Sequence, residues 1–259
     1  LQSINYLAEI KNMGAYSKYI LESVAKGSSK ADTVEDVYAY LGWQGGTDRF
    51  VLADRLITKD GVKKVKTASN KKDIHKENEL KFCGTPKDFA EKVFKPLHRP
   101  ETINHLMSVL LGLTAPLEKV CMSSPGLVLL SGPTGRGKTI CGRAALAIYK
   151  EPNYIFGSGS TQLGVILSAE PDLPTLVDEI TTNIRNSLGN LSYSFSSEGS
   201  SVSSTMHRTL RINKALGNAM LYLTSNLTLS DLADTLMPAH VMRIMEIKLE
   251  TIPTVDACA

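Results

Sequence analysis

The stretch Leu129-Leu130-Ser131-Gly132-Pro133-Thr134-Gly135-Arg136-Gly137-Lys138-Thr139 lies near the middle of this 259-residue chain. Residues 132–139 fit the pattern of a P-loop, a glycine-rich turn that joins a strand to a helix. Glycines let the backbone turn tightly enough for several N–H groups to converge on phosphate oxygens, and the N-terminus of the next helix favours the same anion. An apolar run precedes the turn and a helical pattern follows it. The stretch therefore predicts an α/β fold that binds a nucleoside triphosphate.

This turn supplies most of the expected ligands for ATP and Mg²⁺. Lys138 is expected to reach the β- and γ-phosphates, and the Thr139 hydroxyl is expected to coordinate Mg²⁺. The whole phosphate cradle consists of Gly132, Pro133, Thr134, Gly135, Arg136, Gly137, Lys138 and Thr139. The pattern predicts the ligand and leaves open what is done with it.

Short apolar runs recur from about residue 123 onward, between helical or loop segments. Such runs are typical of strands buried on both faces of a parallel sheet. Pro174 should limit the third run to Thr175 onward, because proline cannot donate to the ladder of a strand. The predicted strands are Leu127–Leu130, Tyr154–Phe156, Leu176-Val177, Ala219–Leu223 and Val241–Leu249.

We divide the chain into an N-terminal accessory region, residues 1–118, and a P-loop ATPase core, residues 119–259. The accessory region is expected to be smaller, first mixed α/β and then helical, with a role as an oligomerisation collar or a docking site. Within it, Phe50–Leu52 and Leu56-Ile57 flank a turn and predict a hairpin. The polar, basic run at residues 59–78 predicts an exposed loop.

Two helices are predicted at the end of the accessory region. The first begins near Thr85, and the second runs from Pro100 to Leu113 until Pro116 ends it. Helical periodicity places these side chains of the second helix inward: Ile103, Leu106, Met107, Leu110 and Leu111.

An acidic pair, Asp178-Glu179, follows the third predicted strand. A P-loop ATPase needs a carboxylate beside Mg²⁺, and a hydrolase also needs a base that activates water. We assign Asp178 to the metal and Glu179 to the water, although an acidic pair at a helix start would have the same sequence. The pair argues against nucleotide kinases, and no NKxD motif of the kind that reads guanine in small GTPases follows the acidic pair.

The run Leu221–Asn226 is an apolar strand that ends in polar residues. Asn226 is our candidate for contact with the γ-phosphate or the attacking water, with Thr224 and Ser225 as second choices. Taken alone, Asn226 is more typical of a turn, and it is the P-loop and the acidic pair before it that favour the functional interpretation.

The three motifs GPTGRGKT, LVDE and LYLTSN stand in this order along the chain. Together they resemble the AAA+ class of ATPases and, within it, the superfamily 3 helicases. The likeness is greatest to the helicase-like ATPase domains encoded beside phage and plasmid primases, and it covers about residues 100–250. The resemblance implies that the strand carrying Asn226 lies between the P-loop strand and the acidic strand.

The resemblance also implies a hairpin that projects into the pore of a ring, here within residues 187–218. The serine-rich segment at residues 192–204 should be a loop or hairpin, because so many serines cannot pack a core. Cations follow it, and a small loop with cations on its flank suits a grip on phosphates that ignores base sequence. We therefore expect single-stranded nucleic acid to contact Arg208, Arg211 and Lys214, although a solvated surface loop remains the alternative.

An arginine from a neighbouring subunit is a further expectation of the resemblance, because such a residue stabilises charge on the γ-phosphate. Arg243 is the candidate placed with the catalytic residues, and Arg208 and Arg211 remain open. Arg243 also stands beside the last predicted strand, where a structural role is equally compatible with the sequence.

These expectations combine into a hexameric, ATP-driven ring motor on single-stranded DNA, a replicative helicase of a phage or mobile element with a primase or polymerase as a further partner. An AAA+ loader, a protein-remodelling ATPase and an ATP-switched scaffold are the alternatives. The net charge of +3 is too small to indicate nucleic acid by itself. The four cysteines are far apart in the sequence, which favours the cytoplasm, and for a phage protein this would be the cytoplasm of the host. The lack of a long apolar run predicts no membrane partner.

Overall fold

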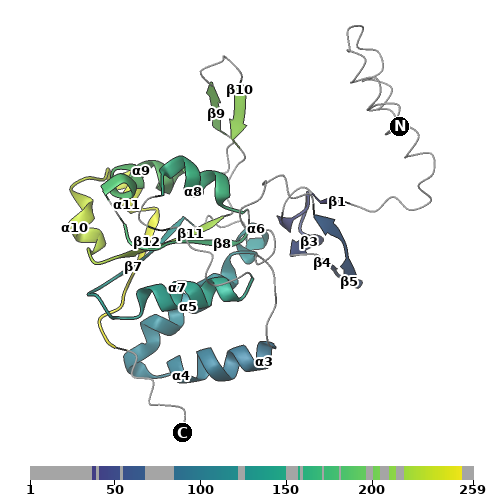
Figure 1. The fold of residues 1–259 in the computed structure, drawn as a ribbon, viewed down its shortest axis with the longest axis horizontal. Coiled ribbons are helices and arrows are strands. Elements are labelled where there is room, and N and C mark those ends of the chain that lie inside the picture. Colours follow the sequence, from purple (N-terminus) through teal and green to yellow (C-terminus); the bar gives the residue numbers. More distant parts are fainter. Residues whose placement is uncertain are drawn as a thin grey trace. The chain divides into compact units, whose positions relative to one another are not determined.

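The computed structural model describes residues 37–38, 41–52, 55–67, 85–121, 126–149, 157, 160–170, 172–180, 182–196, 201–204, 210–213 and 219–252. The chain separates into two compact units, residues 1–37 and 38–259, and the second contains almost every described element. Figure 1 shows a sheet with helices on both faces. The functional division predicted between residues 118 and 119 stays a prediction.

A four-stranded sheet forms the centre of the fold. It consists of β7 (Leu127–Ser131), β8 (Pro174–Val177), β11 (Met220–Ser225) and β12 (Ile244–Lys248), all parallel and ordered β12-β7-β11-β8. Four of the five predicted strands are thereby confirmed, and Tyr154–Phe156 lies outside the described residues. The expected start at Thr175 is wrong, because β8 begins at Pro174, where the first residue of a strand tolerates a missing N–H.

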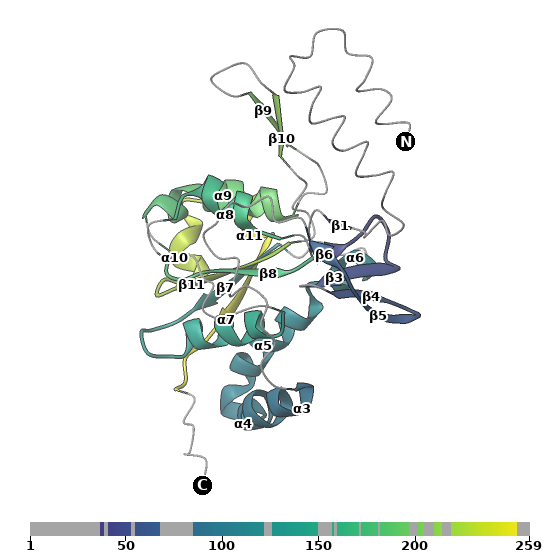
Figure 2. The ribbon, with the colours of Figure 1, turned by 45° about the vertical axis from the view of Figure 1, so that its right-hand side comes forward.

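Both faces of this sheet are buried, as the continuous apolar runs predict. Leu127 and Leu129 of β7 pack in one cluster, whereas Val128 and Leu130 pack in another, because side chains alternate across a strand. The first face is covered by α8 (Gln162–Ser168) and α9 (Thr182–Ser196), and the second by α5 (Ile103–Thr114) and α7 (Lys138–Ala147) (Figures 1 and 2). Along the chain, two short helices, α10 (Leu229–Ala233) and α11 (Pro238–Val241), connect β11 to β12.

The helical segment before the sheet begins where the sequence predicts. Thr85 caps α3 (Pro86–Phe89): its hydroxyl accepts from Asp88 N at 3.2 Å, and Asp88 Oδ2 accepts from Thr85 N at 2.9 Å. The helical path then continues through the π-helix Ala90–Phe94, α4 (Lys95–Leu97), a 3₁₀ turn at Pro100–Thr102, α5 and α6 (Leu117–Cys121).

The inward face of α5 differs from the prediction. Ile103 and Met107 are 45% and 47% exposed, while Leu106 is buried and Leu110 and Leu111 are half-buried. The helix instead turns a small and polar face inward, because a Cβ at Gly112 would stand 2.8 Å from that of Ala145 and the close approach to α7 admits nothing larger. The buried residues of α5 are His105, Leu106, Ser108, Val109 and Gly112.

A small antiparallel sheet precedes these helices. Its strands are β2 (Gly42–Trp43), β3 (Arg49–Leu52), β4 (Arg55–Thr58) and β5 (Gly61–Lys64), in that order, so the predicted hairpin is confirmed. The exposed loop expected at residues 59–78 is wrong where β5 and β6 (Lys66–Thr67) form. Gly61 has a φ of +130°, which permits the tight turn into β5, and every β5 side chain is exposed. The two-residue strand β1 (Val37–Tyr38) completes the described part of this region.

Trp43 attaches the small sheet to the core. Its backbone N–H donates to Asp172 Oδ2 at 2.8 Å and its indole N–H donates to the Pro116 carbonyl at 2.7 Å. The ring packs edge-on against Phe50, which shares a buried cluster with Leu173. Two directed hydrogen bonds and an apolar contact therefore fix β2 and β3 against the core.

A buried carboxyl lies close to this attachment and predicts a pH effect. Burial, followed by the nearby Asp172 carboxylate, raises the pKa of Glu118 from 4.5 to about 8. Glu118 also raises the pKa of Tyr222, after burial. The folded chain thus holds a proton that the unfolded chain releases, so the associated stability is full below pH 4.5 and is lost as pH rises through about 8.

Glu118→Gln should therefore stabilise the protein more at pH 8 than at pH 5, because the amide resembles the protonated carboxyl and does not ionise. Urea unfolding of both proteins at the two pH values measures the difference in unfolding free energy. Glu91→Gln, at an exposed side chain, is the matched control and should not reproduce the gain. Parallel pH profiles for Glu118→Gln and wild type would contradict the assignment.

The serine-rich segment is only partly the predicted hairpin. Residues 192–196 form the end of α9, where Ser192 and Phe195 are fully buried, so the expectation that they cannot pack a core is wrong. Serine tolerates this helix end because its hydroxyl bonds back to the preceding turn, as Ser194 Oγ does to the Asn190 carbonyl at 2.9 Å. The hairpin itself is confirmed as β9 (Ser201–Ser204) paired antiparallel with β10 (Leu210–Asn213), and both views draw it apart from the central sheet (Figures 1 and 2).

Candidate active site

The predicted phosphate cradle lies at the carboxyl edge of the sheet, between β7 and α7. Gly132 has a φ of +141° and donates its N–H to the Ser225 carbonyl at 3.2 Å. A Cβ at this position would overlap the carbonyl oxygen of Leu249, so only glycine fits. Gly137, with a φ of +81°, is the N-cap of α7. The loop conformation therefore depends on the two glycines that define the sequence pattern.

Lys138 ties this loop to the neighbouring strand. Its Nζ donates to the carbonyls of Gly132 at 2.6 Å and Pro133 at 2.8 Å, and to Asn226 Oδ1 at 2.9 Å. Partial burial lowers the pKa of Lys138, and the carboxylates of Asp178 and Glu179 oppose that shift. The ammonium group thus donates to three oxygen acceptors and is also stabilised in its charged form by two carboxylates.

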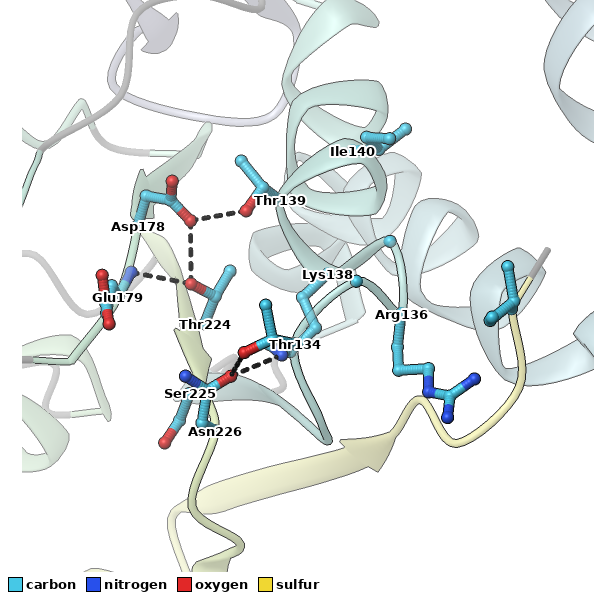
Figure 3. A pocket seen from close by; sticks show the side chains of 13 residues that line it. Thr134, Arg136, Lys138, Thr139, Ile140, Asp178, Glu179, Thr224, Ser225 and Asn226 are labelled. Carbon is cyan, nitrogen blue, oxygen red and sulfur yellow. Dashed lines mark hydrogen bonds between the residues drawn. The ribbon is translucent and has the colours of Figure 1, made fainter.

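The acidic pair is joined to the loop through hydroxyl groups (Figure 3). Asp178 Oδ1 accepts from Thr139 Oγ1 at 2.7 Å and from Thr224 Oγ1 at 2.9 Å. Thr224 Oγ1 in turn accepts from the backbone N–H of Glu179 at 2.7 Å. Glu179 has a φ of +64°, an uncommon conformation for a non-glycine residue, and its side chain is exposed. Thr224 therefore fixes both members of the pair while the Glu179 carboxylate stays accessible.

Asn226 stands directly after β11, which lies between the strand of the P-loop and the strand of the acidic pair. Its Oδ1 accepts from Lys138 Nζ and, at 3.4 Å, from Thr134 Oγ1. The order of the three strands thus brings Lys138, Asp178, Glu179 and Asn226 to one edge, as we predicted.

These residues surround a pocket of about 470 Å³. Sequence reasoning missed Ile140 and Ile252, which are 71% and 57% exposed. Ile140 follows the motif directly and could have been included. Ile252 lies after β12, where Leu249 N donates to the Ser131 carbonyl at 2.8 Å. The lining consists of Thr134, Gly135, Arg136, Gly137, Lys138, Thr139, Ile140, Asp178, Glu179, Thr224, Ser225, Asn226 and Ile252.

Arg243, the candidate placed with the catalytic residues, does not line this pocket. Arg243 precedes β12, at the opposite edge of the sheet, where its Nη1 donates to the Ala239 carbonyl and its guanidinium lies 4.4 Å from the centre of the Tyr193 ring. Arg211 belongs to β10, and Arg208 and Lys214 lie outside the described residues.

In the described part of the chain, no helix is both long and apolar enough to cross a membrane.

The fold is shared with a solved structure of a helicase, SCCmec type IV Cch. The identity is 15%, the TM-score is 0.58, and the match covers 92% of this chain and 46% of that one. The solved C-terminal region of NrS-1 matches with 11% identity and a TM-score of 0.40, over 91% of this chain and 53% of that one. This chain thus spans about half the length of either structure. A comparison with curated proteins found no match.

A likeness at 15% identity shows a helicase-like α/β fold and leaves the activity open. The family is shown by sequence instead. The pattern of a family described as "Domain of unknown function (DUF927)" matches residues 5–214. Because this match extends over most of the chain, the protein belongs to the DUF927 family.

Proposed function

We propose that this chain is a P-loop ATPase of the AAA+-like, superfamily 3 kind. One observation carries the proposal: three parallel strands deliver Lys138, the pair Asp178-Glu179 and Asn226 to one pocket, linked by hydrogen bonds of 2.7–2.9 Å. The fold shared with an active helicase agrees with it.

The residues present fit ATP with Mg²⁺. Thr139 Oγ1 and Asp178 Oδ1 lie 2.7 Å apart and are the hard oxygen donors that Mg²⁺ prefers. The N-terminus of α7 and the Lys138 ammonium face the same pocket and suit a triphosphate. When bound, Mg²⁺ neutralises charge on the phosphates. Thr139 and Asp178 would hold the ion, and residues 132–139 would hold the phosphates.

Hydrolysis requires a base beside the attacking water, and Glu179 suits this role. Its backbone is fixed by Thr224, and its exposed carboxylate lines the pocket. Asn226 would orient the water or the γ-phosphate through its side-chain amide. Asp178, which accepts two hydrogen bonds, is held too firmly to act as the base and suits the metal side of the site.

The same proposal assigns the chain to a ring motor on single-stranded DNA, built from six copies, that acts as a replicative helicase of a phage or mobile element with a primase or polymerase as its partner. The β9–β10 hairpin supports this, because it follows α9 directly and forms a separate two-stranded sheet between the acidic pair and the Asn226 strand. An arginine supplied by the neighbouring copy would complete each pocket. Arg243, Arg208 and Arg211 remain the candidates.

Replacing Arg208, Arg211 and Lys214 together with alanine should weaken binding of single-stranded DNA about 100-fold or more at low salt, because three phosphate contacts would be lost. DNA binding should fall by a larger factor than ATP hydrolysis measured without DNA, because Arg208 and Arg211 are also candidates for the arginine that a neighbouring copy supplies to the pocket. Fluorescence anisotropy with an oligonucleotide measures the first effect and phosphate release the second. A matched variant with alanine at Lys63, Lys64 and Lys92, exposed cations far from the hairpin in sequence, controls for net charge. Equal DNA affinity in the two triple variants would remove the hairpin from the DNA site.

Phosphate release with and without single-stranded DNA separates the proposed motor from the alternatives. A motor on DNA should hydrolyse ATP several-fold faster when the strand is present. Hydrolysis that responds to a protein substrate and ignores DNA would instead support a loader or remodelling ATPase.

A further inference from the structure

We propose that His105 of α5 is a positioning residue for the P-loop, which it holds through the carbonyl of Arg136. The expected effect on nucleotide binding rests on the proposed function. The contact between α5 and the loop rests on the geometry of α5. His105 is 1% exposed, and its Nε2 lies 2.9 Å from Arg136 O.

The bond fixes which ring nitrogen carries a proton. A carbonyl oxygen only accepts, so His105 Nε2 must donate, and in a neutral ring Nδ1 is then an acceptor. That Nδ1 is buried and has no hydrogen-bond partner among the described residues. Burying an unpaired acceptor is unfavourable, and an apolar side chain at this position would avoid it. The hydrogen bond to the loop is therefore the interaction that distinguishes histidine from an apolar residue here.

The loop atom that His105 holds is close to the phosphate ligands. Arg136 immediately precedes Gly137, whose φ of +81° starts α7, and Lys138 follows. Fixing the Arg136 carbonyl thus orients the peptide that leads into the helix N-terminus, where the backbone N–H groups and Lys138 receive the phosphates.

The same face of α5 also reaches the strand of Asn226. Ser108 Oγ donates to the His105 carbonyl at 2.7 Å, and the Tyr222 hydroxyl donates to the Ser108 carbonyl at 2.8 Å. Tyr222 stands two residues before Thr224, which binds Asp178. Through these buried contacts α5 touches both sides of the pocket, the loop and the central strand. A rigid α5, packed closely on α7 at Gly112, therefore keeps the two sides at a fixed separation.

His105→Gln and His105→Asn test the bond directly. The Gln amide nitrogen can reach the position of Nε2, whereas the Asn amide is one bond too short. Val109→Ala is the matched control, because Val109 is fully buried on the same helix and its truncation destabilises the fold without touching the loop.

Hydrogen exchange of the amides at residues 134–140, measured without nucleotide, is the first readout. Exchange should rise about tenfold in His105→Asn and stay near wild type in His105→Gln and Val109→Ala. The second readout is ATP hydrolysis, where His105→Asn should raise KM about tenfold with a much smaller change in kcat.

Three results would overturn the inference. The first is loop exchange in His105→Asn equal to that of the wild type, and the second is loop exchange in His105→Gln as fast as in His105→Asn. The third is loop exchange in Val109→Ala as fast as in His105→Asn at matched stability. A wild-type protein that binds no nucleotide would defeat the proposed function, while the exchange experiment would still decide whether His105 holds the loop.

Discussion

Lys138→Ala should abolish measurable binding of Mg-ATP, with affinity falling about 100-fold or more. The carboxylates of Asp178 and Glu179 favour the charged form of the Lys138 ammonium group, and its three donors already engage oxygen acceptors within the pocket. Phosphate oxygens are stronger acceptors than carbonyls because they carry charge. Alanine removes every one of these bonds. Calorimetric titration of the purified protein with Mg-ATP measures the loss.

Two controls keep this result interpretable. Lys63→Ala, at an exposed lysine of β5, should bind ATP like the wild type. Circular dichroism of Lys138→Ala should show the wild-type helix content, because the loop glycines and the strand order do not depend on the lysine. Unchanged ATP affinity in a folded Lys138→Ala protein would contradict the assignment of the pocket to phosphate.

Glu179→Gln should bind ATP like the wild type and hydrolyse it 10²–10⁴-fold more slowly, the range typical for the loss of a general base. The amide has the shape of the carboxylate and keeps the Glu179 backbone bond to Thr224, but it cannot accept a proton from water. Single-turnover phosphate release measures the rate, and calorimetry measures the affinity.

Glu91→Gln, at an exposed glutamate outside the pocket, is the matched control and should keep full activity. Normal turnover in Glu179→Gln would remove Glu179 from the role of base. A loss of nucleotide affinity together with activity would instead show that this carboxylate shapes the pocket.

The central sheet could be predicted from the sequence because its strands are buried on both faces. Leu127–Leu130 and Ala219–Leu223 are uninterrupted apolar runs, and such runs are local signals that no tertiary contact has to supply. The phosphate loop could also be predicted from the sequence, since Gly132 and Gly137 adopt backbone conformations that favour glycine. The likeness to a known family then predicted that Asn226 and the acidic pair would meet at one edge.

Other features depend on packing that no local pattern encodes. The apolar periodicity of α5 pointed to Ile103 and Met107, yet the close contact between Gly112 and Ala145 turned the helix so that His105 and Ser108 face inward. Thr224 was only a second choice, because its importance arises from the distance between β11 and β8 rather than from its own strand. Ile252 reaches the pocket through a chain segment that gives no sequence signal.

The serine-rich segment shows the limit of composition as a guide. Its serines predict a loop, but Phe195 and Leu191 are spaced to face the core when the segment continues α9, and both are fully buried. Helical spacing of two apolar side chains outweighed the low helix propensity of serine in this turn.

A structure of the protein with Mg²⁺ and a non-hydrolysable ATP analogue tests the central claim most directly. We expect the triphosphate within residues 132–139, Lys138 Nζ bonded to the β- and γ-phosphates, and Mg²⁺ at about 2.1 Å from Thr139 Oγ1 on the side of Asp178. The Glu179 carboxylate should face the γ-phosphate. A nucleotide bound elsewhere, with Lys138 still bonded to the Gly132 and Pro133 carbonyls and to Asn226, would contradict the assignment of this pocket to Mg-ATP.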